Sequence, residues 1–179
     1  MKNHAGGGGG GDGGGDGFQS YSTYSDDNTI PTVDTSEWGP PTWKALHIAS
    51  VHSPHLGTWK ELLAALGNDL PCPECRGHYS DWYNANPLQV RFLPIHRMMR
   101  GNNVNVGVII INWVLNLHND VNRRTSTDEI PKSAWSRQQI YDTYGGDRAT
   151  RLAEGRDALA TVQGVIGERS YEILSRLLS

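Results

Sequence analysis

Cysteine is scarce in this chain of 179 residues, which contains only two of them. An exported scaffold held together by disulfides would carry more, so we expect the pair to have a chemical role rather than an architectural one. Long apolar runs and a charged-then-apolar leader are also lacking, so we expect neither a membrane span nor a signal peptide. The formal net charge is −3 and no block of basic residues occurs, which argues against a nucleic-acid partner.

Glycine, by contrast, is concentrated near the N-terminus, where residues 6–11 are all glycine. Residues 1–30 consist largely of Gly, Asp, Ser and Tyr, and such a segment buries too little apolar surface to offset its chain entropy. We therefore predict a disordered tail over residues 1–30. The remainder suits one domain over residues 31–146, followed by a helical extension over residues 147–179.

Three helices are expected in the first half of the ordered chain. The first should begin at Pro41, because proline suits the first turn of a helix. The second should begin at Thr58, which forms with Glu61 the signature of a capping box, and should end at Gly67. The third should begin at Cys72.

Residues 106–124 carry the longest apolar run of the chain. Its β-branched start could be taken for a strand, but its length and its helical spacing favour a buried helix. His118 and Asn122, four residues apart, would share a face of this helix and could hold a ligand together. Such a pair could equally satisfy backbone groups between helices.

The other segments complete an all-α prediction. Residues 85–105 contain several helix breakers and are expected to form a loop or a short helical turn. Residues 133–144 indicate a short helix, and residues 148–178 show an amphipathic stripe that we interpret as a helix capping the bundle. We find no convincing strand, so the fold class is predicted to be all-α.

Both cysteines, Cys72 and Cys75, lie in one Cys-Pro-Glu-Cys motif with a proline on each side of the first. Because proline is tolerated in the first turn of a helix, we expect Cys72 at the helix start and Cys75 one turn further. Residues three apart face the same way, so the sulfurs can reach disulfide distance. The unpaired N–H groups at a helix start favour a thiolate and lower the thiol pKa. The motif therefore predicts a redox disulfide.

Two other interpretations of the cysteine pair stay open. A zinc-binding module would use Cys72 and Cys75 together with His47, His78 or His118, but neither a second cysteine pair nor an H-x3-5-H motif follows. A purely structural helical module with an incidental cysteine pair is the other interpretation. We rank both below a redox role and expect no bound metal.

Three motifs, in this order, resemble the signatures of the Erv/ALR family of FAD-linked sulfhydryl oxidases. They are Trp38-Gly39-Pro40-Pro41-Thr42-Trp43-x-x-Leu46-His47, Leu70-Pro71-Cys72-Pro73-Glu74-Cys75 and Leu117-His118-Asn119-Asp120-Val121-Asn122-Arg123. The central motif is most similar to the short versions carried by large DNA viruses. The resemblance covers about residues 37–127 and implies a bundle of four helices plus a short fifth, a homodimer, and FAD at the mouth of the bundle.

The resemblance also implies roles for individual residues. Cys72 would be attacked by a substrate thiolate, and Cys75 would pass electrons to the flavin. Trp43 and His47 would pack on the cofactor and hydrogen-bond to it, and Gly39 would contact the flavin. The adenosine part would be clasped by His118, Asn119 and Asn122, and the pyrophosphate would face Arg123 and Arg124.

The function implied is an FAD-dependent thiol oxidase that forms disulfides in protein or small thiols and reduces oxygen to hydrogen peroxide. Many relatives carry a second, shuttle disulfide, which this chain lacks. Either thiol substrates reach Cys72 directly, or a separate upstream redox protein delivers the electrons. Leu70 stands where an aromatic residue is common. A viral protein of this kind would work in the host cytoplasm or the virion.

Overall fold

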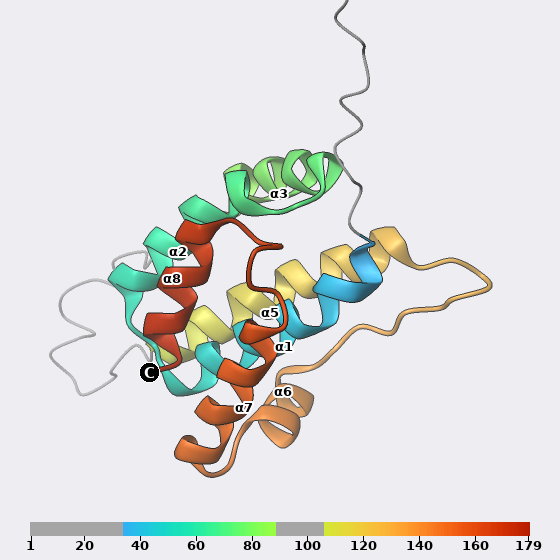
Figure 1. Ribbon diagram of the computed structural model, residues 1–179. Helices are drawn as coiled ribbons and strands as arrows, with labels where there is room; N and C mark the ends of the chain where they lie inside the picture. Colours follow the sequence, from blue (N-terminus) through green and yellow to red (C-terminus); the bar gives the residue numbers. More distant parts are fainter. Residues whose placement is uncertain (1–33, 89–105) are drawn as a thin grey trace, which may run out of the picture. The chain divides into compact units, whose positions relative to one another are not determined.

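The computed structural model describes residues 34–88 and 106–179, and its regular secondary structure is helical. The helices in chain order are α1 (Thr35–His52), α2 (Leu56–Asp69), α3 (Pro73–Ala85), α5 (Val106–Thr125), α6 (Arg137–Tyr144), α7 (Arg148–Ala160) and α8 (Glu168–Leu177) (Figure 1). No strand occurs in the described residues, so the all-α prediction is confirmed. The tail predicted over residues 1–30 and most of the loop predicted over 85–105 lie outside the described residues.

Helix α1 begins at Thr35, so the predicted start at Pro41 is wrong. The side chain of Asp34 accepts a hydrogen bond from the backbone N–H of Ser36 at 2.8 Å and caps the helix. Asp is among the strongest N-cap residues, and its cap lets the helix start earlier although Pro40 and Pro41 then remove two backbone donors from its interior. The early start places Trp38 in the buried cluster of the protein.

Helix α2 also starts earlier than predicted, and the capping box from Thr58 is wrong. The N-cap residue is His55, whose side chain makes no capping bond, and Gly67 lies inside the helix rather than at its end. The fully buried Trp59 fixes the entry instead, because its Nε1–H donates to the carbonyl oxygen of Ser53 at 2.9 Å. The helix ends at Asp69 because Pro71 forces the residue before it into an extended conformation.

The C-terminal stripe is divided into two helices, α7 and α8, where a single helix was predicted over residues 148–178. Gly164, in the connecting residues, has a φ of 77°, a left-handed conformation that favours glycine. Helix α7 packs on α1 and α8 packs on α2 (Figure 1). Gly155 permits close packing of α7 on both sides, because a Cβ there would lie 3.2 Å from Cγ2 of Ile48 in α1 and 2.6 Å from Cδ2 of Leu178, the residue after α8.

The apolar side chains of α7 and α8 belong to the same buried cluster as those of α1 and α2. Its fully or almost fully buried members include Ile48, Leu62, Leu63, Leu159, Leu174, Leu177 and Leu178. Because burial of such side chains is the main favourable term in folding, the C-terminal segment helps to hold α1 and α2 in place.

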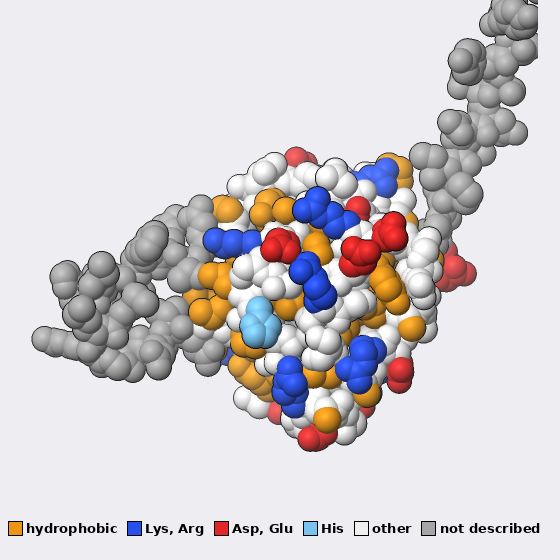
Figure 2. Space-filling model, turned by 60° about the vertical axis from the view of Figure 1, so that its left-hand side comes forward, with side chains coloured by type: hydrophobic (Ala, Val, Ile, Leu, Met, Phe, Trp, Pro, Cys, Tyr) orange, Lys and Arg blue, Asp and Glu red, His pale blue; other side chains and the backbone are white. Residues whose placement is uncertain are grey.

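The surface of the described part carries few large apolar side chains. Ile130 is 65% exposed and Tyr141 is 38% exposed. On the face shown in Figure 2, Lys and Arg side chains lie among Asp and Glu side chains. None of the described helices combines the length and the apolar character needed to cross a membrane.

Candidate functional site: a disulfide and a histidine–aromatic cluster

A disulfide joins Cys72 and Cys75 at the start of α3, where the sequence predicted it. Cys72 is the N-cap residue, and its Sγ accepts a hydrogen bond from the backbone N–H of Cys75 at 3.1 Å. Pro73 and exposed Glu74 occupy the first turn, where a missing N–H costs nothing and a negative charge is favourable. Both cysteines are half-buried, so the motif is partly open to solvent while it packs against the buried cluster.

A second feature is the contact between two histidines from α1 and α5. His47 Nε2 lies 2.8 Å from His118 Nδ1, although the residues are 71 positions apart in the chain. Trp43, one turn before His47 on α1, stacks on His118 with ring centroids 4.2 Å apart and an interplanar angle of 9°. Helix α1 thus brings two of the predicted cofactor residues to a third on α5.

Two aromatic residues that the sequence analysis did not single out complete this cluster. Tyr144, the last residue of α6, stacks on His47 at a centroid distance of 5.4 Å, and Trp135 stacks on His47 at 6.3 Å. Trp135 also stacks on His118 at 6.1 Å. The sequence does contain a signal for Trp135, since it is a lone tryptophan in the mainly polar segment 126–136. Tryptophan is largely buried in most proteins, so it should pack against another part of the chain. We refer to Trp43, His47, His118, Trp135 and Tyr144 as the aromatic cluster.

Burial keeps both histidines of the aromatic cluster neutral. Burial, with a smaller effect of His118, lowers the pKa of His47 to about 3. Burial, with a smaller effect of the Lys132 charge, lowers the pKa of His118 to about 4. Their shared hydrogen bond uses Nε2 of His47, and the other ring nitrogen, Nδ1, is buried without a partner in the described part of the chain. A buried polar atom of this kind is costly unless a ligand satisfies it.

Acid is expected to destabilise the protein through these two histidines. In the unfolded chain their pKa is near the ordinary value of 6.5, so between about pH 4 and 6.5 the unfolded state binds more protons than the folded state. The free energy of unfolding should therefore fall as the pH drops below 6.5. The fall should be about 1 kcal/mol per pH unit for His47, which is fully buried, and less for His118, which is partly exposed. Urea unfolding of the protein at a series of pH values measures this slope, and His47→Gln should reduce it. A slope that is unchanged by this substitution would contradict the assignment.

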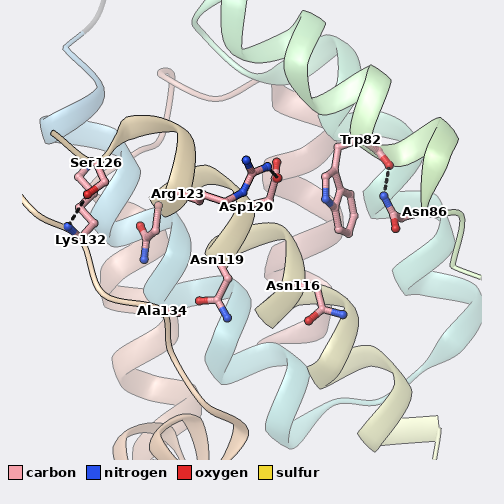
Figure 3. Close-up of a pocket in the computed structure, with 10 residues that line it drawn as sticks. Trp82, Asn86, Asn116, Asn119, Asp120, Arg123, Ser126, Lys132 and Ala134 are labelled. Carbon is pink, nitrogen blue, oxygen red and sulfur yellow. Dashed lines mark hydrogen bonds and ion pairs between the residues drawn. The ribbon is translucent and has the colours of Figure 1, made fainter.

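An open cavity of about 740 Å³ lies between α3, α5 and the segment after α5 (Figure 3). Trp82 and Asn86 come from α3 and the residue after it, and Arg123 and Lys132 supply positive charge. The remaining lining residues are Asn116, Asn119, Asp120, Asn122, Ser126 and Ala134. The lining therefore combines an aromatic face with amide groups, two cationic groups and the carboxylate of Asp120.

The two predicted asparagines use their amides on the backbone of the segment beyond α5. Asn119 Nδ2 donates to the carbonyl oxygen of Trp135, and its Oδ1 accepts from the N–H of Trp135, both at 2.8 Å. Asn122 Nδ2 donates to the carbonyl oxygen of Ser133 at 3.2 Å. Asn119 thus holds Trp135 in the aromatic cluster while lining the cavity, and it connects the two features.

The other predicted residues lie less close together. Arg123 and Arg124 both pair with Asp120, and of the two only Arg123 lines the cavity. Gly39 lies in α1 with open space where a Cβ would stand, and it does not line the cavity. Trp43, Cys72 and Cys75 all pack against the same buried cluster. In residues 34–88 and 106–179, no group of three or more His, Cys, Asp or Glu side chains is placed to hold a metal ion.

Comparison with a family model and comparison with curated proteins indicate the same family. A family model described as the Erv1 / Alr family matches residues 40–141. Two curated relatives, both named FAD-linked sulfhydryl oxidase and both from African swine fever virus isolates, are each 29% identical to this chain over 112 residues. Each alignment covers 59% of this chain and 80% of the relative. No solved structure matches the chain significantly. The matched region contains both cysteines and both histidines of the aromatic cluster.

Proposed function

The chain belongs to the Erv1/Alr family, and from that premise we propose that it is an FAD-linked sulfhydryl oxidase. The observation that carries the proposal is the half-buried Cys72–Cys75 disulfide at the start of α3. The overall reaction joins two thiols in a disulfide and transfers two electrons and two protons to molecular oxygen, which gives hydrogen peroxide. Thiol-containing proteins and small thiols are the substrates.

The first chemical step takes place at Cys72. A substrate thiolate attacks Cys72 Sγ, the Cys72–Cys75 bond breaks, and a mixed disulfide forms while Cys75 leaves as a thiolate. A second substrate thiolate attacks the substrate sulfur of the mixed disulfide, which releases the product disulfide and leaves Cys72 as a thiolate. Each substrate thiol gives its proton to solvent. The Cys75 N–H and the helix start stabilise negative charge on Cys72 Sγ, which favours its release in this second step.

The aromatic cluster and the cavity fit a flavin nucleotide. Flat rings stack favourably on the aromatic faces of Trp43, Trp135 and Tyr144, and the unpartnered Nδ1 of His47 offers a hydrogen bond to a polar ring atom. The cavity beside them offers to a charged linker Lys132 and Arg123, the latter already paired with Asp120. When bound, FAD supplies the redox step that no side chain can perform, taking the electron pair of the reduced cysteines to oxygen.

The cysteine content limits the routes by which electrons can reach the Cys72–Cys75 disulfide. Because the chain has only two cysteines, it carries no second disulfide to relay electrons to the first. Substrate thiols therefore reach Cys72 directly, or an upstream redox protein delivers the electrons. A homodimer, and a place of action in the host cytoplasm or the virion, stay predictions from the family resemblance and the viral relatives.

An absorbance spectrum of the purified protein tests the proposal directly. We expect a yellow protein with flavin bands that, on addition of dithiothreitol, consumes oxygen and releases about one hydrogen peroxide per disulfide formed, because oxygen takes up one electron pair for each disulfide. Metal analysis of the same sample serves as the control. If the folded protein is colourless, contains zinc and does not take up FAD, the proposed oxidase function is wrong and a zinc-binding module takes its place.

A further inference from the structure

The start of α8 is capped by a residue from another helix. Gly167, its N-cap residue, has no side chain to cap the free backbone N–H groups. Asp69, the last residue of α2, takes this role across 101 positions of sequence, since its Oδ2 accepts from the N–H of Ser170 at 2.7 Å. The carbonyl oxygen of Asp69 also accepts from the N–H of Gly167 at 2.8 Å. One residue thus satisfies two free donors of α8.

The closeness of this junction requires glycine at position 167. A Cβ on Gly167 would overlap the carboxyl carbon of Asp69. Only a residue without a side chain allows the start of α8 to approach the end of α2 so closely. The hydrogen bonds and the steric fit are independent observations, and both place α8 at Asp69.

The same stretch of chain is held from its other side by α3. Arg76 Nη1 donates to the carbonyl oxygen of Leu70 at 2.7 Å. Pro71 follows, and Cys72 comes next as the N-cap residue of α3. The path from α2 to the disulfide is therefore fixed at Asp69 by α8 and at Leu70 by Arg76.

We propose that Asp69 is a positioning residue of the oxidase, which uses α8 to hold the loop 70–72 so that Cys72 keeps its N-cap geometry. The inference rests on the proposed function, since it takes Cys72–Cys75 as the redox disulfide. It extends the functional unit beyond the matched residues 40–141, because α8 lies outside them. If the loop loses this support, the Cys72 sulfur loses the Cys75 N–H and the helix start as stabilisers of its thiolate.

The variant Asp69→Ala removes the side-chain cap and tests this role. We expect kcat for dithiothreitol oxidation to fall on the order of three- to tenfold with little change in KM, because loss of a helix cap shifts a conformational equilibrium by about that factor and lets the loop 70–72 leave the geometry that places Cys72. In the anaerobically reduced protein, the pH midpoint for alkylation of Cys72 should rise by about half a unit. Asp69→Asn keeps an oxygen acceptor and should restore both values. Gly167→Ala displaces the carboxylate without removing it and should act in the same direction, which keeps the test available if Asp69→Ala does not fold.

The matched control is Glu61→Ala, on the same pair of helices. Glu61 Oε2 pairs with Arg176 Nη2 of α8 at 3.0 Å, at an exposed position, so its loss weakens the α2–α8 contact without touching the junction at Asp69. Its kcat and its alkylation profile should equal those of the wild type. The inference is overturned if folded Asp69→Ala or Gly167→Ala keeps the wild-type kcat and alkylation midpoint, or if Glu61→Ala changes both equally. A wild type that does not oxidise dithiothreitol would defeat the proposed function instead, while the alkylation midpoints would still test the junction.

Discussion

Cys72→Ser is expected to leave the protein yellow and to abolish thiol oxidation. The variant cannot form the disulfide with Cys75 that a substrate thiolate attacks, whereas the aromatic cluster and the cavity contain neither cysteine. We expect kcat to fall roughly 10³-fold or more, the scale on which removal of a nucleophilic group acts. Oxygen consumption with dithiothreitol gives the rate, and the visible spectrum gives the flavin content of the same sample.

Two further variants make the Cys72 result specific. Cys75→Ser should lose turnover to the same extent, because one remaining cysteine cannot re-form the internal disulfide. His78→Ala, at an exposed position on the same helix, should stay within about twofold of the wild-type rate, as surface substitutions commonly do. Turnover that persists in Cys72→Ser at the wild-type level would show that the thiol chemistry takes place elsewhere.

The start of α3 could be predicted because its signals are local. Two prolines, the spacing of the cysteines and the helix-compatible residues that follow all act within one turn, and the structure places Cys72 at the N-cap position. The predicted starts of α1 and α2 were wrong for two different reasons. At α1, capping by Asp34 stabilises the early start more than the two prolines destabilise it. The start of α2 depends on the hydrogen bond from Trp59 Nε1–H to the carbonyl oxygen of Ser53 rather than on a capping box.

The aromatic cluster shows what sequence reasoning supplies and what it misses. His47 and His118 were singled out by their motifs, but their hydrogen bond depends on how α1 and α5 pack, which spacing along one helix does not contain. Trp135 reaches the cluster only because Asn119 binds both its N–H and its carbonyl oxygen. The asparagine was predicted to clasp a ligand, and its observed partner is the backbone, the alternative that was left open for its neighbour Asn122.

His118→Ala is expected to release much of the bound FAD. The substitution removes the ring that stacks on Trp43 and on Trp135, and it removes the hydrogen-bond partner of His47 Nε2. Loss of a stacked ring and of one hydrogen bond costs about 1–3 kcal/mol, so the dissociation constant for FAD should rise roughly tenfold or more. The ratio of flavin to protein after purification, and a fluorescence titration of the flavin-free protein, measure the change.

His55→Ala provides the matched control, because His55 is exposed and its side chain makes no capping bond at the start of α2. It should keep the wild-type flavin ratio. His118→Ala should also leave the Cys72–Cys75 disulfide intact, since that bond lies on α3, and thiol titration of the unfolded variant checks this. An unchanged flavin ratio in His118→Ala would remove the aromatic cluster from the cofactor site, whereas a lowered ratio with an intact disulfide places cofactor binding and thiol exchange on separate residues of one protein.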